Sequence, residues 1–495
     1  MSGPLPPPPP AVRAHAFAPA LAVVVPAALA LALGLWGIRR EGTLWGDEAV
    51  SYEVAHRTLP EIWRTLGHVD AVHGLYYLFL HGVFGVWDGG LVALRLPSVL
   101  AVAAGAAGVA LLGRTLAGTR AGLLAGLVFP LIPAVQRYAQ EGRSYALVCA
   151  LVVWTTWLLT AAVGRPRGRR WAAYAAVILT ACLLHEFALL TLLAHGVTVF
   201  RSGPTRPVVR GWGAAAAVVV AGTLPLAVLS STQSSQVNWI GAPGVRHTLG
   251  FAAVVLIGLV CARTPPRAAL VPPVSRPGAV ALPLLILPTS LLMALTPLRA
   301  LYVERYVLSY TAALALLLGV ALDGVWRRTR HGDRRARQAG YAVTAGAGLL
   351  AVLALVPVGT YLRTPQSRQN DATAIARAVR ESAEPGDGLI FTPARRRVWT
   401  LAGPEEFRGL ADLALDRSPV ASGTLHGTEL TPGVVRARML AARRIVVVHD
   451  IAGEPLDSAD RESVKRSTLR AAFEPCGTRR VTRAQITLYA RPGTC

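Results

Sequence analysis

Long apolar runs recur from residue 17 to residue 361, and many of them approach the length needed to cross a lipid bilayer. A membrane-spanning helix needs about 20 predominantly apolar residues. The chain is 53% hydrophobic with a mean hydropathy of +0.45, well above the usual values for a soluble protein. These runs predict an all-α polytopic membrane protein and exclude a soluble multidomain enzyme.

Apolar length and the positions of arginines predict eleven transmembrane helices. These lie at 17–38, 92–112, 121–136, 144–163, 171–184, 187–200, 211–229, 248–262, 278–297, 306–326 and 340–361. Every second connection is short and rich in arginine: 113–120, 165–170, 201–210, 263–267 and 327–338. Because arginine and lysine concentrate in cytoplasmic loops, we expect these connections inside the cell and the others outside.

The formal charge of +23 comes almost wholly from arginine, since Lys465 is the only lysine. A strongly basic chain raises the possibility of nucleic-acid binding. Here the arginine clusters are short and separated by apolar runs, so the membrane topology accounts for them. The sequence therefore predicts no nucleic-acid partner.

The predicted outer loops hold most of the acids, glutamines and histidines outside the tail. In the first of them, residues 73–87 form an apolar segment of about 22 Å as a helix, shorter than the ~30 Å hydrocarbon core. We expect this segment to lie at the outer interface, where its tyrosines and Trp87 are favoured. Helix interiors almost free of charge, with no internal repeat, argue against a transporter.

The two ends of the chain differ from the centre. Residues 1–16 are proline-rich and predicted to be disordered. Residues 17–362 form the membrane domain, and 363–495 are long enough for a small extracytoplasmic α/β domain. Within it the pattern predicts a helix at 371–383 and strands at 387–393, 443–450 and 484–492. Spacing alone leaves open whether Cys476 and Cys495 form a disulfide.

The stretch LWGDEAVSY (44–52) places two acids directly after the first apolar run. Asp47 taken alone is well explained as the cap of an interfacial helix at 48–57, with Glu48 favourable to the helix dipole. By the same reasoning Gln140, Glu141 and Arg143 form a solvated rim and His185 is a lone interfacial histidine. The argument for function is that five separate outer loops bring such groups to one face, where a cavity would collect them.

Several stretches, taken in order, resemble the polytopic glycosyltransferases of the GT-C superfamily. They are LWGDEAVSY, GHVDAVHGLYYLFLHGVFGVW, ALRLPSVLAVAAGAAGVALLGRTL, AQEGRSYAL and ERYVLSYTAALALLLGVALDGV, within residues 20–360. The chain is most similar to bacterial relatives of protein O-mannosyltransferases and aminoarabinose transferases, in glycosyltransferase family 39 and the RgtA/B/C/D-like group. The resemblance implies an inverting transferase that takes a sugar, such as mannose, from a polyprenyl-phosphate donor in the membrane. A protein or glycan hydroxyl at the outer face is the acceptor.

The resemblance also implies roles for individual residues. Asp47 matches the first-loop acid that acts as general base. Glu48 would then support Asp47 as its partner, or act as the base in its place. The remaining positions match substrate-binding parts of the pattern: Asp70, His73, Gln140, Glu141, Arg143, Arg305 and Tyr306; His185 joins them as a polar group of the same face. Relatives often carry a proline pair or Lys-Pro near His73, and Gly142 replaces an alanine.

The chemistry supports this reading independently. A lipid phosphate leaves as a stabilised anion, so the site needs positive charge, which Arg143 or Arg305 supplies. A hydroxyl is a poor nucleophile, so a placed carboxylate helps as base. The sequence leaves a divalent cation beside Asp47 and Glu48 open, since no Asp-x-Asp motif is present. The alternatives are a non-catalytic scaffold of the same fold and a lipid-linked-sugar transporter.

Overall fold

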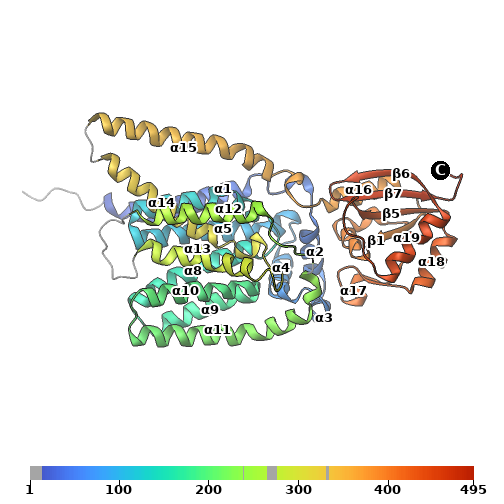
Figure 1. Ribbon diagram of the computed structural model, residues 1–495, viewed down its shortest axis with the longest axis horizontal. Coiled ribbons are helices and arrows are strands. Elements are labelled where there is room, and N and C mark those ends of the chain that lie inside the picture. The colour runs from blue at the N-terminus through green and yellow to red at the C-terminus, as the bar shows by residue number, and fades with distance from the viewer. Residues whose placement is uncertain (1–13, 238, 265–275, 331–333) are drawn as a thin grey trace, which may run out of the picture.

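A helical bundle and a smaller α/β domain lie end to end in the computed structural model, which describes residues 14–237, 239–264, 276–330 and 334–495 (Figure 1). The first thirteen residues of the predicted disordered segment 1–16 lie outside the described part. The long helices are α1 (Ala14–Leu35), α5 (Leu91–Ala117), α8 (Tyr145–Gly164), α9 (Gly168–Leu184), α10 (Leu190–Arg201), α11 (Arg206–Thr232), α12 (Val245–Ala262), α13 (Pro277–Ala294), α14 (Tyr310–Arg330) and α15 (Arg334–Leu362).

Seven helices of the described part are long and apolar enough to cross a membrane, and a bent pair makes an eighth. The seven are α1, α5, α8, α11, α12, α13 and α14. A helix satisfies all its backbone groups internally, which is why apolar runs cross lipid in this form. The chain is therefore a multi-pass membrane protein. The predicted spans 171–184 and 187–200 are also helical, although α9 and α10 have only 17 and 12 residues.

The transmembrane helix predicted at 121–136 is helical but broken in the middle. Helix α6 (Thr119–Val128) passes into a short 3-10 turn (Phe129–Leu131), and α7 (Pro133–Ala139) leaves at an angle of 65°. Pro130 and Pro133 lack the N–H groups that a continuous helix would use, so the backbone breaks there. The bend turns α7 toward the loop that contains Gln140 and Arg143.

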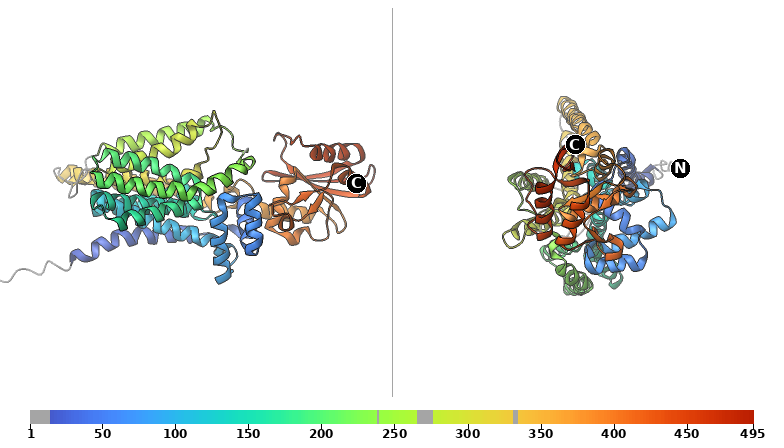
Figure 2. Two further views of the ribbon diagram at one scale, coloured as in Figure 1. Left: turned by 90° about the horizontal axis from the view of Figure 1, so that it is seen from below. Right: turned by 90° about the vertical axis from the view of Figure 1, so that its right-hand side faces the viewer.

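Three short helices follow α1 and lie across the end of the bundle that faces the α/β domain (Figure 2). They are α2 (Gly46–His56), α3 (Leu59–His68) and α4 (Gly74–Val86). As predicted for 73–87, α4 is too short to cross, with 13 residues or about 20 Å of helix. Helix α3 begins with a capping box in which Thr58 and Glu61 satisfy each other's backbone groups.

The bundle helices from α8 onward run alternately up and down, so every second connecting loop lies at the same end of the bundle. The loops after α8, α10 and α14 lie at the end away from the α/β domain (Figure 1). These loops, 165–170, 201–210 and the described part of 327–338, are the arginine-rich ones. The short helices and the α/β domain lie at the opposite end. The protein thus has one arginine-rich end and one end that carries the acids of the first loop.

The C-terminal domain contains a five-stranded sheet in the order β2-β1-β5-β7-β6. The strands are β1 (Gly388–Thr392), β2 (Ala411–Asp412), β5 (Arg444–Asp450), β6 (Glu474–Val481) and β7 (Ala484–Ala490). Strand β1 is parallel to β2 and β5, and β7 is antiparallel to both its neighbours. The three predicted strands are confirmed as β1, β5 and β7, and the predicted helix at 371–383 is α16 (Ala372–Ser382).

Helices cover both faces of this sheet. Alternate residues of β1 and β5 point to opposite sides, so Phe391 packs with α16 while Ile390 packs with α18 (Pro432–Ala441) and α19 (Asp460–Ala472). A hairpin of β3 (Leu415–Arg417) and β4 (Thr428–Glu429), with the short helix α17 (Pro419–Ser422), extends from one edge. Cys476 and Cys495 form a disulfide that ties the chain end to β6.

Candidate active site

Asp47 lies in the first turn of α2 and faces two guanidinium groups. Its Oδ1 is 3.9 Å from Nη2 of Arg143, and its Oδ2 is 3.6 Å from Nη2 of Arg305. The Asp47 side chain is 33% exposed, whereas those of the two arginines are buried. The residue before the helix is Trp45, and no side chain of its own caps the first turn. Asp47 is therefore not the cap of this helix, and its carboxylate is both accessible and surrounded by positive charge.

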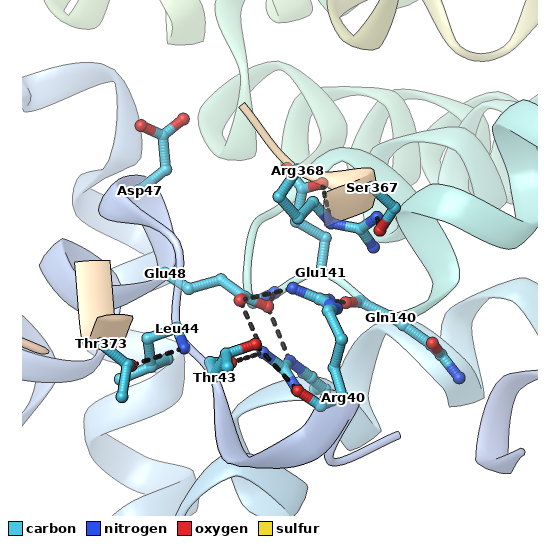
Figure 3. Close-up of polar contacts among 12 residues, drawn as sticks. Arg40, Thr43, Leu44, Asp47, Glu48, Gln140, Glu141, Ser367, Arg368 and Thr373 are labelled. Atoms are coloured by element: carbon cyan, nitrogen blue, oxygen red, sulfur yellow. Dashed lines mark hydrogen bonds and ion pairs between the residues drawn. The ribbon is translucent and has the colours of Figure 1, made fainter. Parts of the chain in front are cut away.

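Glu48 points away from Asp47, into the protein (Figure 3). Its side chain is fully buried, and both oxygens are engaged. Arg95 donates to them from Nε at 2.8 Å and from Nη2 at 2.7 Å, Arg40 donates at 3.1 Å, and the backbone N–H of Gly142 donates at 3.1 Å. This network joins the start of α2 to α5 and to the 140–144 loop.

Although burial raises the pKa of Glu48, the guanidiniums of Arg40 and Arg95 hold it well below its ordinary value. Glu48 therefore stays ionised, and its lone pairs are taken by arginines. These two neighbouring acids do not fit a divalent cation, because Glu48 has no free oxygen and Asp47 faces Arg143 and Arg305. In the described residues no group of three or more histidines, cysteines or acids is placed to hold a metal ion.

Asp70 and Arg143 meet at Tyr77. The Tyr77 hydroxyl donates a short hydrogen bond to Oδ2 of Asp70, and Nη1 of Arg143 donates to the same hydroxyl at 3.1 Å. Asp70 has a left-handed backbone (φ 62°), which turns the chain from α3 toward α4. Burial lowers the pKa of Arg143, but Tyr77, Asp47 and Asp70 together raise it above the ordinary value. Arg143 is therefore a permanent buried cation.

Arg305 lies in the short turn Glu304–Val307 that precedes α14. Its Nε donates to the hydroxyl of Tyr145 at 3.1 Å. Its guanidinium carbon lies 5.9 Å from the ring centre of Trp45 and 5.6 Å from those of Tyr145 and Tyr306. Cation–π attraction of this kind is strengthened by burial. Aromatic rings thus hold Arg305 in place while one Nη faces Asp47.

His73 and His185 are buried beside these arginines. Their ring centres are 6.0 Å apart, and the Nδ1 atom of each has no hydrogen-bond partner. Burial, together with the nearby charges of Arg143 and Arg305, lowers the pKa of both imidazoles well below the ordinary value. Both rings are therefore neutral at physiological pH, and each has one ring nitrogen without a hydrogen-bond partner in the described part of the chain.

A cavity opens next to this group. His185, Arg305, Tyr306 and Tyr145 contribute its polar wall. The rest of its lining is mostly apolar: Val148, Cys149, Val152, Phe187, Ala188, Thr191, Pro288, Val307, Leu308 and Ser309. The cavity thus has one polar wall, while the remainder of its lining is mainly apolar.

Gln140 and Glu141 are buried and contact other parts of the chain than the site arginines. The Gln140 amide donates to the backbone carbonyls of Gly34 (2.8 Å) and Trp36 (2.6 Å), so it ties α7 to the end of α1. Glu141 is buried with Oε2 3.8 Å from Nε of Arg368, and burial raises its pKa. The structure therefore gathers one group and leaves three residues outside it. The group is Asp47, Asp70, His73, Arg143, His185, Arg305 and Tyr306; the three are Glu48, Gln140 and Glu141.

Sequence reasoning missed several residues of this network. Arg40 and Arg95 neutralise Glu48, and Tyr77 and Tyr145 orient the two site arginines. Arg95 carried a usable signal, because a lone arginine inside an apolar run is seldom present without a buried partner. The tyrosines carried none, since their positions are equally suited to a membrane interface.

No protein-family model matches the sequence, and no curated protein matches it either. Solved structures do match. ArnT from Cupriavidus metallidurans in the apo state superposes with a TM-score of 0.55 and 14% identity, over 94% of this chain and 97% of that one. The same enzyme bound to undecaprenyl phosphate gives 0.52 and 13% over the same shares. The apo oligosaccharyltransferase of Archaeoglobus fulgidus gives 0.53 and 11%, over 88% of this chain and 70% of that one.

This chain has the GT-C fold. The likeness covers almost the whole of ArnT, including its C-terminal part. At identities of 11% to 14% it establishes the GT-C fold and not the reaction. The finer prediction, family 39 and the RgtA/B/C/D-like group, stays a prediction.

Proposed function

We propose that the protein is an inverting glycosyltransferase that moves a sugar from a polyprenyl-phosphate donor to an acceptor hydroxyl. The observation that carries this proposal is the placement of Asp47: an accessible carboxylate beside two buried arginines, next to a cavity with a polar wall and an apolar body. The GT-C fold supports it, since one structure of similar fold holds undecaprenyl phosphate.

Asp47 acts as the general base in this proposal. The acceptor oxygen attacks the anomeric carbon and forms the new glycosidic bond while its proton passes to the Asp47 carboxylate. The bond from the anomeric carbon to the phosphate oxygen breaks, and the polyprenyl phosphate leaves with the electron pair. A single displacement of this kind inverts the anomeric centre. A well-placed general base contributes about 10²–10⁴ to such a rate.

Arg305 and Arg143 hold the phosphate. Both are buried cations fixed by tyrosines, so they offer donors to the leaving oxygen without reorganising. A phosphate is already a stable anion when it leaves, and the proposal needs no general acid. Asp70, His73, His185 and Tyr306 complete the substrate-binding group, with the two imidazole Nδ1 atoms available to sugar hydroxyls. Glu48, Gln140 and Glu141 position these elements and do not touch substrate.

The site faces the outside of the cell in this proposal. The arginine-rich connections lie at the end of the bundle away from Asp47, and the positive-inside rule assigns that end to the cytoplasm. A lipid-carried donor suits this location, because nucleotide sugars are confined to the cytosol. Within the hexoses, mannose is the donor sugar we propose first. A protein or glycan hydroxyl is the acceptor.

Substituting Asp47→Asn tests the proposal. Purified protein in lipid is incubated with radiolabelled polyprenyl-phosphate mannose and a membrane extract as acceptor source, and the labelled products are analysed by mass. We expect turnover to fall by about 10²–10⁴, since the amide cannot accept the proton. Binding of undecaprenyl phosphate should stay within a few-fold of the wild type, because the two arginines remain.

Asp88→Asn is the matched control, because that carboxylate is exposed and lies beyond α4, where it contacts His56 at 3.2 Å and accepts the N–H of Gly90 at 3.4 Å. It should keep full turnover. Equal turnover in Asp47→Asn and the wild type would refute the assignment of the base. If the wild-type protein binds polyprenyl-phosphate sugars and transfers none of them, the result would favour one of the two alternatives, a non-catalytic scaffold or a lipid-linked-sugar transporter.

A further inference from the structure

Helix α2, which carries Asp47, begins without a cap of its own. The first N–H groups of a helix have no partner within it and usually bond to the side chain of the preceding residue. Here that residue is Trp45, and it provides no such bond. The start of α2 therefore depends on groups from elsewhere in the chain.

The C-terminal part supplies those groups from more than 320 positions away along the chain. Oδ1 of Asn370 accepts the N–H of Gly46, the first residue of α2, at 2.7 Å. Oγ1 of Thr373 accepts the N–H of Leu44 at 2.9 Å, and the Leu44 carbonyl accepts the N–H of Ala372 at 2.9 Å. These bonds fix the three residues that immediately precede Asp47.

The same domain holds the other end of α2. Nη2 of Arg57, just after the helix, donates to the carbonyl of Thr424 at 3.1 Å. Between the two ends, Val398 and Leu401 of the 3-10 segment Ala394–Ala402 pack against the apolar core of the bundle. Helix α2 is thus held along its length between the membrane bundle and the C-terminal domain.

We propose that Asn370 is a positioning residue for Asp47 and caps the catalytic helix from the C-terminal domain. The proposal rests on the function proposed above. Asp47 is only one residue beyond the N–H that Asn370 accepts, and it keeps distances of 3.6 and 3.9 Å to its two arginines. Releasing the Gly46 N–H frees the first turn of α2 to move, which displaces the carboxylate from the acceptor. Displacements of about 1 Å cost up to about a hundredfold in rate.

The kinetic test compares Asn370→Ala with Asn370→Asp in the full-length protein. Alanine removes the acceptor and should lower kcat about ten- to a hundredfold with little change in KM for the lipid donor. Aspartate keeps an acceptor oxygen and should restore most of kcat. In an Asp47→Asn background, Asn370→Ala should add no further loss, because both changes act through one carboxylate. Additive losses would assign Asn370 to a different step and overturn the proposal.

A second readout does not depend on turnover. Amide hydrogen exchange of residues 44–47 should be faster in Asn370→Ala and in Thr373→Val than in the wild type. Thr400→Val is the control, since its hydroxyl donates to the carbonyl of Arg397 within its own turn. Unchanged exchange at 44–47 overturns the capping role even if the protein is an active transferase. If exchange is faster in the variants but the wild-type protein transfers no sugar, the capping role of Asn370 is supported and the proposed function is refuted.

Discussion

Asp47 and Glu48 are adjacent in the sequence and lie in opposite environments. Successive residues of an α-helix point about 100° apart around its axis, so Asp47 faces the cavity side while Glu48 enters a core where two guanidiniums contact it. A buried pair of this kind is costly to break, because removing one partner leaves the other charge buried and unpaired. We therefore expect the two acids to respond differently to loss of charge: loss at Asp47 should lower turnover, and loss at Glu48 should lower the stability of the fold.

Glu48→Gln should lower the free energy of unfolding by about 3–5 kcal/mol, since Arg40 and Arg95 lose their counter-ion. Thermal unfolding of the protein in detergent measures it. Glu381→Gln is the control, because Glu381 pairs with Arg479 and both side chains are about half exposed. It should cost less than about 1 kcal/mol. Similar losses in both variants would contradict the buried network.

The same ion pair predicts a pH dependence. Because the folded-state pKa of Glu48 lies below its ordinary value, ionised Glu48 stabilises the fold fully at pH above that ordinary value. This stability is lost progressively as the pH falls from there toward the folded-state pKa. Unfolding temperatures measured between pH 7 and about pH 3 should fall less steeply in Glu48→Gln than in the wild type. Parallel pH curves would show that other acids dominate the acid sensitivity.

The sequence identified individual site residues only where a charged side chain stands in an unusual position. An acid pair directly after an apolar run, together with arginines in the predicted outer loops, identified the site region, and Asp47, Arg143 and Arg305 do lie together. It could not separate Asp47 from Glu48, because the choice depends on where α5 places Arg95 in space. Asn370 was invisible for the same reason, since its partner Gly46 is brought to it only by the fold.

At the scale of elements, apolar length predicted most helices well, because lipid forces apolar runs into helices. It failed at 121–136, where Pro130 and Pro133 break the helix within an otherwise continuous apolar run. In the tail, short runs of apolar and β-branched residues between polar segments predicted β1, β5 and β7. The exposed edge strand β6 was missed because it contains few apolar residues and carries arginines instead.

The packing of α6 leads to a prediction about stability, because its backbone lies in close contact with α5 and with α14. A Cβ at Gly122 would lie 2.4 Å from the carbonyl oxygen of Ala110 in α5, and one at Gly319 would lie 2.4 Å from the backbone N of Ala125 in α6. Gly122→Ala and Gly319→Ala should each destabilise the protein by at least about 1–3 kcal/mol. Gly250→Ala in α12 has open space around it and should be neutral or slightly stabilising. Thermal unfolding compares the three.

In the whole molecule, the distribution of arginine and the position of the disulfide distinguish the two ends of the protein. The arginine-rich connections lie at one end and the disulfide Cys476–Cys495 at the other. Disulfides persist in oxidising compartments, and arginine-rich loops stay in the cytoplasm. Both rules favour the orientation proposed above, with the candidate active site and the C-terminal domain outside. They are independent, because one concerns insertion and the other redox environment.

A thiol-labelling experiment tests that orientation, because the three other cysteines, Cys149, Cys182 and Cys261, are free and buried. In intact cells, a membrane-impermeant maleimide should label the protein only after mild reduction opens the Cys476–Cys495 disulfide. Replacing both with serine should abolish this labelling. In that background, Thr205→Cys, exposed just before α11 at the arginine-rich end, should react only once the membrane is opened. Labelling of Thr205→Cys in intact cells would invert the topology and place Asp47 inside, where it could not meet an external acceptor.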